Sequence, residues 1–527
     1  MKKIVLIFLT LILMISLAAC DIDSLIPDNQ DNIDQNIDDP DIDDPDIDNP
    51  DIDDPNIDDP DIDDPDIDDP IILEPIDQLD IYYINDLHGA ILENDDQMGL
   101  ANIGNLVLSK KAENPNETLF LSGGDILQGN VLSNYFYGAS TIDILNDMQL
   151  DAFVLGNHEF DWGLDVITQY FIEDSESDVK ANFPLLGANV FYAGTTERPE
   201  GVDAYTIIDK GDMKIGIIGV VGTDIESSIA TSKIQPYYFD DATYWTTYYA
   251  EYLRTVENVD MVIAINHDSD DSYNQEISEL ENDSFVDVIF NGHSHQTYVD
   301  SFPRSPYTSY VIQSGASGTN VGYVSFDITN KIVTGVTASN LTQSNEPLLN
   351  SESLLVADKI DTYVTQIDTL LNEVIITAGE SMSRSELTNY MAKIMCLITG
   401  ADIAFHNYGG TRTSIDYHQD ITVATLYEIF PFDNVIKTVK IKGSAINSFI
   451  GYGDGSNYYT EITNFDDDTY YLVATNDYIF DKEDYPFIYG IDGINTGILI
   501  RDLLEDILIN MSDSYTYFYL DNDIDLS

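Results

Sequence analysis

Short apolar runs recur through the middle of the chain, each bounded by polar residues and glycines. They have the length of buried strands rather than of helices, and they occupy residues 81–84, 118–121, 152–155, 214–221, 261–265 and 286–290. Helical segments and loops separate the runs, and this alternation predicts a layered α/β domain. We place that domain at residues 77–344.

The pattern changes near residue 345. Residues 351–373 carry apolar side chains at helical spacing, with Asn350 or Ser351 in position to cap the helix. We therefore expect residues 345–373 to form a helix that links the first domain to a second one at residues 374–527.

Histidines gather where the apolar runs end, and five of the seven in the chain do so. The patches are Asp86-Leu87-His88-Gly89, Gly156-Asn157-His158-Glu159, Asn266-His267-Asp268 and Gly292-His293-Ser294-His295, and Gly123-Gly124-Asp125 follows a further run in the same way. Neutral histidine and nearby carboxylates are ligands of divalent metals. Because the carboxyl ends of neighbouring strands converge in an open α/β sheet, the patches predict a metal-dependent enzyme.

Two of the patches contain ligand pairs two residues apart, Asp86 with His88 and His293 with His295. In extended backbone such residues point the same way, so each pair is expected to face one ion cluster. The other two histidines, His406 and His418, match no metal motif, and we interpret them as loop or interface residues.

The N-terminus has the pattern of an export signal. Lys2 and Lys3 precede an apolar stretch, residues 4–17, that is shorter than a membrane span, and Leu17-Ala18-Ala19-Cys20 resembles a bacterial lipoprotein signal. On that resemblance residues 1–20 are a signal peptide and Cys20 becomes lipidated, which anchors the protein on the extracytoplasmic face of the cell membrane. The alternative is an ordinary secretory signal cleaved nearby, and either signal exports the protein. The only other cysteine, Cys396, is expected to be a small buried residue.

Residues 21–76 form an acidic, proline-rich segment. From Asn36 to Pro70 a unit of the type Asp-Ile-Asp-Asp-Pro occurs seven times. Proline in every unit prevents helix and central strand, and like charges repel, so we expect an extended, disordered spacer. At about 3.1 Å per residue, roughly fifty residues would hold a domain on the order of 150 Å from a membrane.

The whole chain is strongly acidic. It has 527 residues, of which 95 are acidic and 21 basic, and its formal net charge is −74. Phosphate backbones need a basic face, so a nucleic acid polymer is excluded as a partner, and no protein partner is implied. A folded surface this acidic fits a saline medium, in which self-repulsion is screened.

Taken together, the patches resemble a known signature. Asp86-x-His88, Gly124-Asp125, Gly156-Asn157-His158-Glu159, His267 and Gly292-His293-x-His295 look like those of calcineurin-like metallophosphoesterases, and Gly156 to Asp161 is typical of the secreted 5′-nucleotidase group. That group includes nucleotidase/UDP-sugar hydrolases and 2′,3′-cyclic nucleotide phosphodiesterases. The resemblance covers about residues 78–490. It implies a four-layer α/β/β/α sandwich joined through a helix to a smaller α+β substrate-binding domain.

The resemblance also implies a site for two divalent ions, which would be Zn, Mn, Co or Fe. One ion would be bound by Asp86, His88 and His295, the other by Asn157, His267 and His293, with Asp125 bridging them. The ions would clamp the phosphoryl oxygens and make hydroxide available for in-line attack.

A catalytic dyad follows from the same resemblance. Asp161 would hold the imidazole tautomer of His158, which would stabilise the transition state or protonate the leaving group. Asn157 would contact the substrate as well as a metal.

The second domain contains three short motifs: Asn407-Tyr408-Gly409-Gly410-Thr411-Arg412, Phe430-Pro431-Phe432-Asp433-Asn434 and Thr475-Asn476-Asp477-Tyr478. They resemble the substrate-binding motifs of the 5′-nucleotidase C-terminal domain. On that match, Arg412 and Arg384 would grip phosphate. Phe432 and Tyr478 would sandwich the base, and Asn407, Asn434 and Asp484 would bond the base edge and the ribose. Family members have two glycines before that aspartate, where this chain has Asp481-Lys482-Glu483.

These features predict an extracellular, membrane-tethered hydrolase that releases phosphate from nucleotides, with closure between the two domains gating turnover. A 2′,3′-cyclic-nucleotide 2′-phosphodiesterase/3′-nucleotidase and a UDP-sugar hydrolase would use the same kind of site, and both stay open. From another class, an inactive nucleotide-binding surface lipoprotein or adhesin also stays open.

Overall fold

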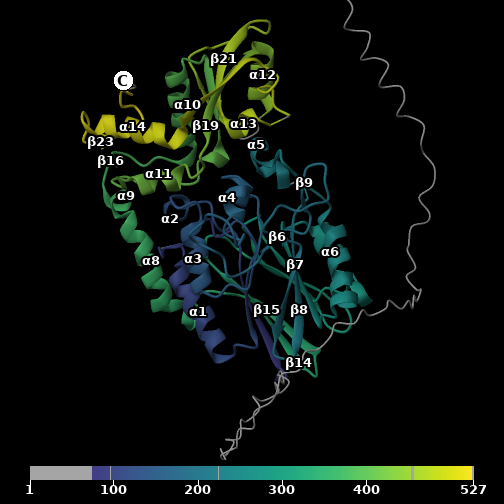
Figure 1. Ribbon diagram of the computed structural model, residues 1–527. Coiled ribbons are helices and arrows are strands. Elements are labelled where there is room, and N and C mark those ends of the chain that lie inside the picture. Colours follow the sequence, from purple (N-terminus) through teal and green to yellow (C-terminus); the bar gives the residue numbers. More distant parts are fainter. Residues whose placement is uncertain (1–73, 95, 224, 453–455, 483, 525–527) are drawn as a thin grey trace, which may run out of the picture. The chain divides into compact units, whose positions relative to one another are not determined.

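The computed structural model describes residues 74–94, 96–223, 225–452, 456–482 and 484–524 (Figure 1). The expected signal peptide, Cys20 and all of the spacer except its last three residues lie outside these ranges. Among the helices within them, none has both the length and the apolarity needed to cross a bilayer.

Two β-sheets form the centre of the first domain. The larger contains, in order across the sheet, β15 (Ile332–Leu341), β14 (Val321–Thr329), β1 (Gln78–Ile84), β2 (Thr118–Ser122), β3 (Ala152–Val154), β4 (Leu185–Leu186) and β6 (Val202–Asp203). The smaller contains β12 (Thr297–Phe302), β13 (Ser309–Ser314), β11 (Val288–Asn291), β10 (Met261–His267), β8 (Met213–Val221) and β7 (Tyr205–Lys210). Each of the six apolar runs overlaps a strand of these sheets.

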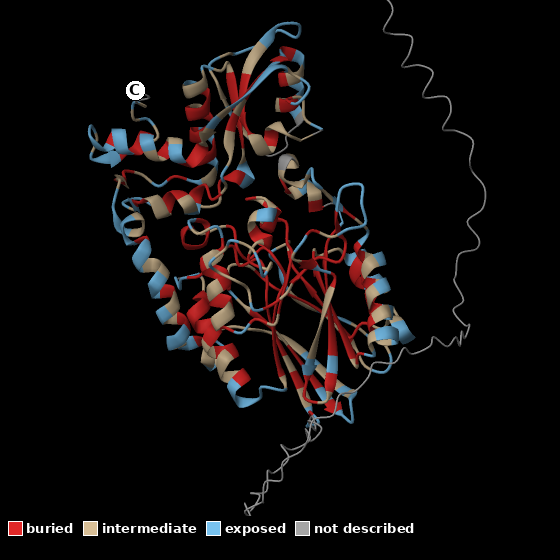
Figure 2. Cartoon of the chain, in the orientation of Figure 1, coloured by how far each residue is buried: buried red, intermediate tan, exposed pale blue. Residues whose placement is uncertain are grey.

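Helices cover the outer faces of both sheets. Figure 1 shows α1 (Gly99–Glu113), α3 (Ala139–Asp147) and α8 (Leu354–Gln366) on one side and α6 (Ala242–Tyr252) on the other, with α7 (Asp271–Ser278) packed beside α6. Successive strand residues point to opposite faces. On β1, Ile81 faces the second sheet and Tyr82 the helices, and on β8 the same division separates Ile217 from Ile218. Buried residues therefore run along the strands of both sheets (Figure 2), and the predicted four-layer α/β/β/α sandwich is confirmed.

The three central strands of each sheet are parallel. β1 pairs with β2 and β2 with β3, while β10 pairs with both β8 and β11. Their carboxyl ends consequently meet at one edge of each sheet, which is where the histidine patches lie.

The linking helix begins later than predicted. Neither Asn350 nor Ser351 caps it, because residues Pro347–Asn350 form a separate 3₁₀ turn that buries Leu349. Instead the side chain of Ser353 accepts a hydrogen bond from the N–H of Val356 and starts α8, and a second short helix, α9 (Asp368–Asn372), follows it.

The second domain is built on a five-stranded sheet in the order β20 (Ser456–Thr460), β17 (Ile403–Asn407), β21 (Tyr470–Asn476), β19 (Val435–Lys442) and β22 (Ile491–Leu499). One face packs against α10 (Arg384–Thr399), which contains the buried Cys396, and α14 (Ile500–Ser512); the other packs against α12 (Gly443–Tyr452). A three-stranded sheet of β18 (Asp420–Ile421), β16 (Ile376–Ala378) and β23 (Tyr517–Phe518) completes the domain.

Candidate active site

The predicted metal ligands converge from strand ends of both sheets. In the larger sheet Asp86 and His88 follow β1, Asp125 follows β2 and Asn157 follows β3. In the smaller sheet His267 is the last residue of β10, and His293 and His295 follow β11.

One group of ligands surrounds His267. Its Nε2 lies 3.2 Å from Asp125 Oδ2 and 3.2 Å from Asn157 Oδ1. The Nδ1 atom of His293 is 2.8 Å from the same Asn157 oxygen. Ligand atoms of Asp125, His267 and His293 all lie within 4.8 Å of one another.

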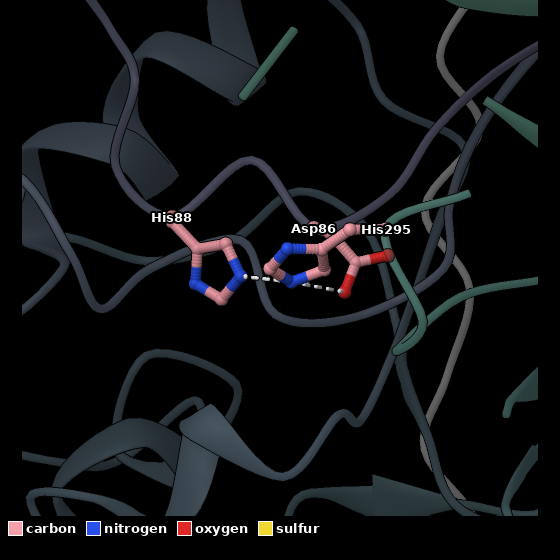
Figure 3. A group of neighbouring side chains, drawn as sticks. All are labelled: Asp86, His88 and His295. Carbon is pink, nitrogen blue, oxygen red and sulfur yellow. Dashed lines mark hydrogen bonds and ion pairs between the residues drawn. The ribbon is translucent and has the colours of Figure 1, made fainter. Parts of the chain in front are cut away.

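The second group contains Asp86, His88 and His295 (Figure 3). The Nε2 atoms of the two histidines are 2.9 Å apart, and His295 Nε2 is 3.6 Å from Asp86 Oδ1. Asp125 also groups with His88 and His158, so its carboxylate lies between the two sets.

This donor set fits divalent cations. The Nδ1 atoms of His88 and His267 lie 3.2 and 2.6 Å from the backbone carbonyls of Gln128 and Gly123. A carbonyl can only accept, so Nδ1 carries a proton, and in the neutral form of each ring the Nε2 lone pair points into the cluster, as in metal-ligating histidines. Burial lowers the pKa of His293 and of His295 to about 4, which leaves both rings neutral and able to ligate.

The carboxylates add negative charge to the same place. Burial lowers the pKa of His267, but Asp125 outweighs it and raises that pKa to about 10. Burial raises the pKa of Asp86 to about 7. The rise at His267 shows that the cluster attracts positive charge.

The ligands are held by an unusual backbone conformation. Five of the seven have left-handed φ angles: 49° at Asp86, 50° at His88, 54° at Asp125, 69° at His293 and 59° at His295. The expectation that the paired ligands lie on extended backbone was therefore wrong, and tight loops rather than strand alternation direct them inward. Such conformations cost about 1–3 kcal/mol each and persist where the surroundings over-determine them.

Two glycines allow the loops to approach closely. A Cβ on Gly124, whose φ is 88°, would lie 2.6 Å from the nitrogen of Gly156, and one on Gly156 would lie 2.3 Å from Asp125 Oδ1. Any side chain at either position would displace the ligand loop.

Glu159 is a functional residue that the sequence reasoning missed. It is fully buried, and its carboxylate accepts hydrogen bonds from the N–H groups of Asp125 at 2.8 Å, Ile126 at 3.0 Å and Gly156 at 2.8 Å. It thereby ties the loop after β2 to the loop after β3. An acidic residue between His158 and the buried Phe160 was the available signal.

His158 and Asp161 are in contact, as the dyad requires. Nδ1 of the ring lies 2.7 Å from Asp161 Oδ2, and Nε2 lies 3.9 Å from Asp125 Oδ2. Burial alone would lower the pKa of His158, but the charges of Asp161 and Asp125 raise it to about 9. The ring stacks on Phe432 of the second domain, with centroids 5.6 Å apart and planes 25° from parallel.

A cavity of about 290 Å³ joins the ligand cluster to the second domain. Its walls include the following predicted residues: Asp125, Asn157, His158, Asp161, His293 and His295 from the first domain, and Asn407, Arg412, Phe432, Asn434 and Tyr478 from the second. Lys233, on the short helix α5 (Thr231–Ile234), and Asp477, on α13 (Asp477–Phe480), also line it and were not foreseen.

Two predicted substrate residues do not line this cavity. The Nε atom of Arg384 donates to the carbonyl of Thr411 at 2.8 Å, and the guanidinium lies over the ring of Tyr408. Asp484 is exposed.

Comparisons with known proteins agree with this architecture. Residues 79–297 match the family of calcineurin-like phosphoesterases, and residues 364–460 match the 5′-nucleotidase C-terminal domain. Protein UshA of Yersinia enterocolitica is 27% identical over 429 residues, which cover 70% of this chain and 75% of that protein. The human 5′-nucleotidase is 25% identical over 426 residues, covering 70% of each chain.

Longer relatives match over part of their length. The chain spans a quarter of the Bacillus subtilis trifunctional nucleotide phosphoesterase protein YfkN, to which it is 24% identical over 378 residues, or 64% of this chain. Among solved structures, the 5′-nucleotidase precursor from Thermus thermophilus has the same fold, with a TM-score of 0.69 and 20% identity over 82% of this chain and 96% of that one. The two domain matches, in this order, place the chain in the 5′-nucleotidase family, which joins a calcineurin-like phosphoesterase domain to a 5′-nucleotidase C-terminal domain.

Proposed function

We propose that this protein is a metal-dependent phosphohydrolase that releases phosphate from nucleotides, as a 5′-nucleotidase does. One observation carries the proposal: a single cavity is lined by metal ligands, by the cationic Arg412 and by the aromatic side chains of Phe432 and Tyr478. Phosphate and base are the two parts of a nucleotide that such walls recognise.

Asp86, His88 and His295 would hold one divalent cation, Asn157, His267 and His293 a second, and Asp125 would contact both. When bound, the cations would place positive charge beside the phosphoryl oxygens and lower the pKa of a coordinated water. Histidine, aspartate and asparagine ligands suit Zn, Mn, Co or Fe.

His158 would act on the leaving group. The Asp161 carboxylate accepts a hydrogen bond from Nδ1–H, which fixes the ring and leaves Nε2 to carry or release a proton in the cavity. With a pKa of about 9 the ring holds that proton near neutral pH and can donate it to the departing oxygen, or stabilise its charge. Arg412 lines the same cavity and would neutralise phosphate charge.

The second domain would bind the base. Phe432 and Tyr478 both line the cavity, and the ammonium of Lys482 lies 4.3 Å from the ring centre of Tyr478. Stacking of a base on an aromatic ring contributes about 1–3 kcal/mol and tolerates any base.

A second cavity favours an additional substrate class. It has a volume of about 340 Å³ and shares His88, His295 and Arg412 with the ligand cluster and the first cavity. If the substrate phosphate lies against the metal ligands and Arg412, this second cavity would accommodate a second substituent on the phosphate, as in a UDP-sugar or a cyclic nucleotide.

The test is a phosphate-release panel with 5′-, 3′-, 2′,3′-cyclic and sugar nucleotides. Dialysis against a chelator should abolish release, and Zn, Mn, Co or Fe should restore it. Release from 5′-nucleotides at the highest kcat/KM supports the proposal. Binding of nucleotides without release under any of these metals would identify an inactive nucleotide-binding protein instead.

We also propose that the enzyme works outside the cytoplasm, anchored through a lipid on Cys20. The support is the sequence from Lys2 to Cys20. Wild-type protein expressed in a bacterium should incorporate labelled palmitate and sediment with membranes, whereas a Cys20→Ser variant should do neither. Equal labelling of the two proteins would exclude the anchor.

A further inference from the structure

The side-chain amide of Asn476 has only one possible orientation. It caps α13, where its Oδ1 accepts a hydrogen bond from the N–H of Ile479 at 2.9 Å. Its amino group must therefore point the other way, toward Asn407 Oδ1 at 2.7 Å and His406 Nδ1 at 3.3 Å. Asn476 and His406 are both buried.

This arrangement determines what Asn407 offers to a ligand. Because its Oδ1 accepts from Asn476, its Nδ2 is the free end of the amide, and Asn407 lines the cavity. The cavity therefore presents a hydrogen-bond donor at this position.

Asn434 is oriented in the opposite sense. Its Nδ2 donates to Asp477 Oδ1 at 2.8 Å. A carboxylate accepts hydrogen bonds and does not donate them, so the free end of Asn434 is its Oδ1, an acceptor.

Asp477 supplies a second acceptor. The same Oδ1 also takes the N–H of Tyr478 at 3.0 Å, while Oδ2 has no donor among the described residues. Burial raises the pKa of this carboxyl, and the hydrogen bond from Asn434 and the charge of Lys437 oppose that rise. Asp477 and Asn434 line the cavity beside the stacking ring of Tyr478.

We propose that Asp477, Asn434 and Asn407 together select the base of the substrate and favour guanine. The proposal rests on the nucleotidase function proposed above. One donor and two acceptors complement a base edge that carries one acceptor beside two donors. Guanine offers O6 as the acceptor and N1–H and the 2-amino group as donors.

The other bases leave part of this array unpaired. Hypoxanthine lacks the 2-amino group, adenine has one amino group and no N1–H, and uracil and cytosine present O2 where a donor is needed. A polar group left without a partner in a substrate pocket penalises the wrong substrate more strongly than a lost apolar contact does.

The first experiment compares kcat/KM for GMP, IMP, AMP, UMP and CMP, with ribose 5-phosphate as the substrate without a base. GMP should exceed AMP by about tenfold or more, with IMP between them. If all nucleotides are hydrolysed within about threefold of one another, guanine selection is wrong and the nucleotidase function stands.

Binding separates the two proposals when no substrate is hydrolysed. Calorimetric titration of the full chain with GMP and AMP measures base preference without turnover. Tighter binding of GMP by about tenfold supports the base-reading role even for an inactive protein. Equal affinities overturn it.

The variant Asp477→Asn tests the residue itself. It keeps an oxygen for Asn434 but exchanges the free acceptor for an amide, so the GMP-to-IMP ratio of kcat/KM should fall toward one. The matched control is Asp481→Asn, which removes the same charge four residues later. Asp481 does not line the cavity, and its carboxylate lies 2.6 Å from the ammonium of Lys437. The control should retain the wild-type ratio. Equal shifts in both variants would mean that net charge, and not the Asp477 acceptor, sets the preference.

Discussion

The two halves of the candidate active site are held in place by different means. In the ligand cluster the backbone does the holding: five ligands have left-handed φ angles, and Glu159 ties two of the loops together through their N–H groups. The other half is the proposed base clamp, made up of Asn407, Asn434, Asp477 and Tyr478. Its backbone is ordinary at Asn407, with φ −75° and ψ 140°. There side-chain hydrogen bonds set the directions, because Asn476 orients Asn407 and Asp477 orients Asn434.

Because the two halves are held differently, their substitutions should affect activity differently. A cluster fixed by backbone is pre-organised for cations, and loss of one ligand should remove most of the activity. A clamp fixed by side chains should be tuned gradually, one hydrogen bond or one ring at a time.

The largest effect is expected for Asp125→Asn, since Asp125 lies between the two ligand groups. Asparagine tolerates the left-handed backbone, so the loop should keep its shape while the shared charge is lost. We expect kcat to fall by at least about 10³-fold for every substrate. Steady-state kinetics and the metal content of the purified variant check this. Near-normal turnover would mean that the shared carboxylate is dispensable.

His158→Ala should cost about 10²–10³-fold in kcat while both metals stay bound, because it removes a proton donor rather than a ligand. The measurement pairs kinetics with metal analysis. A variant that lost metal along with activity would instead place His158 among the ligands.

Tyr478→Ala breaks the clamp rather than the cluster. We expect kcat/KM for nucleotides to fall about 5- to 150-fold, equivalent to the roughly 1–3 kcal/mol of base stacking. The loss should be smaller for p-nitrophenyl phosphate, which has no base. Tyr478→Phe is the matched control, and it should remain close to wild type because the ring is retained. Equal losses for both kinds of substrate would place Tyr478 outside the base site.

The smallest effect on activity is expected at His406, where the prediction concerns stability instead. Burial keeps this histidine neutral by lowering its pKa to about 3. An unfolded histidine has a pKa near about 6.5, so below that pH the unfolded state binds the extra proton. The contribution of neutral His406 to the free energy of unfolding should therefore be fully present above about pH 6.5. Below that pH it should decline by about 1.4 kcal/mol per pH unit, until the pH approaches the folded pKa. Denaturant unfolding at several pH values measures this slope. The His406→Gln variant, which cannot titrate, should lose that part of it, and parallel slopes would contradict the assignment.

Sequence reasoning succeeded where local pattern and chemistry coincide. The buried strands and the polar patches at their ends were predictable, because apolar runs, glycines and ligand types all lie within a few residues of one another. The direction of the ligands was not predictable, since φ angles such as the 50° at His88 depend on how the loops meet.

Long-range contacts limited the prediction of the clamp. Asp477 and Asn476 act through Asn434 and Asn407, which are 43 and 69 positions away in the chain. Arg384 was predicted to bind phosphate, yet its Nε donates a hydrogen bond to the carbonyl of Thr411. His406 is a buried strand residue and not the loop or interface histidine that we expected.

The left-handed ligand positions restrict how this protein can diverge. A residue that replaces one of these ligands must meet two requirements. It must bind a cation, and its backbone must adopt a φ between 49° and 69°. Glycine and asparagine adopt such a φ readily, whereas valine and isoleucine do not. A saturation library at His295 should thus yield folded but inactive glycine and asparagine variants and few folded β-branched ones. In relatives that are not selected for activity, the metal-binding side chains would be replaced long before the loop backbone changed its conformation.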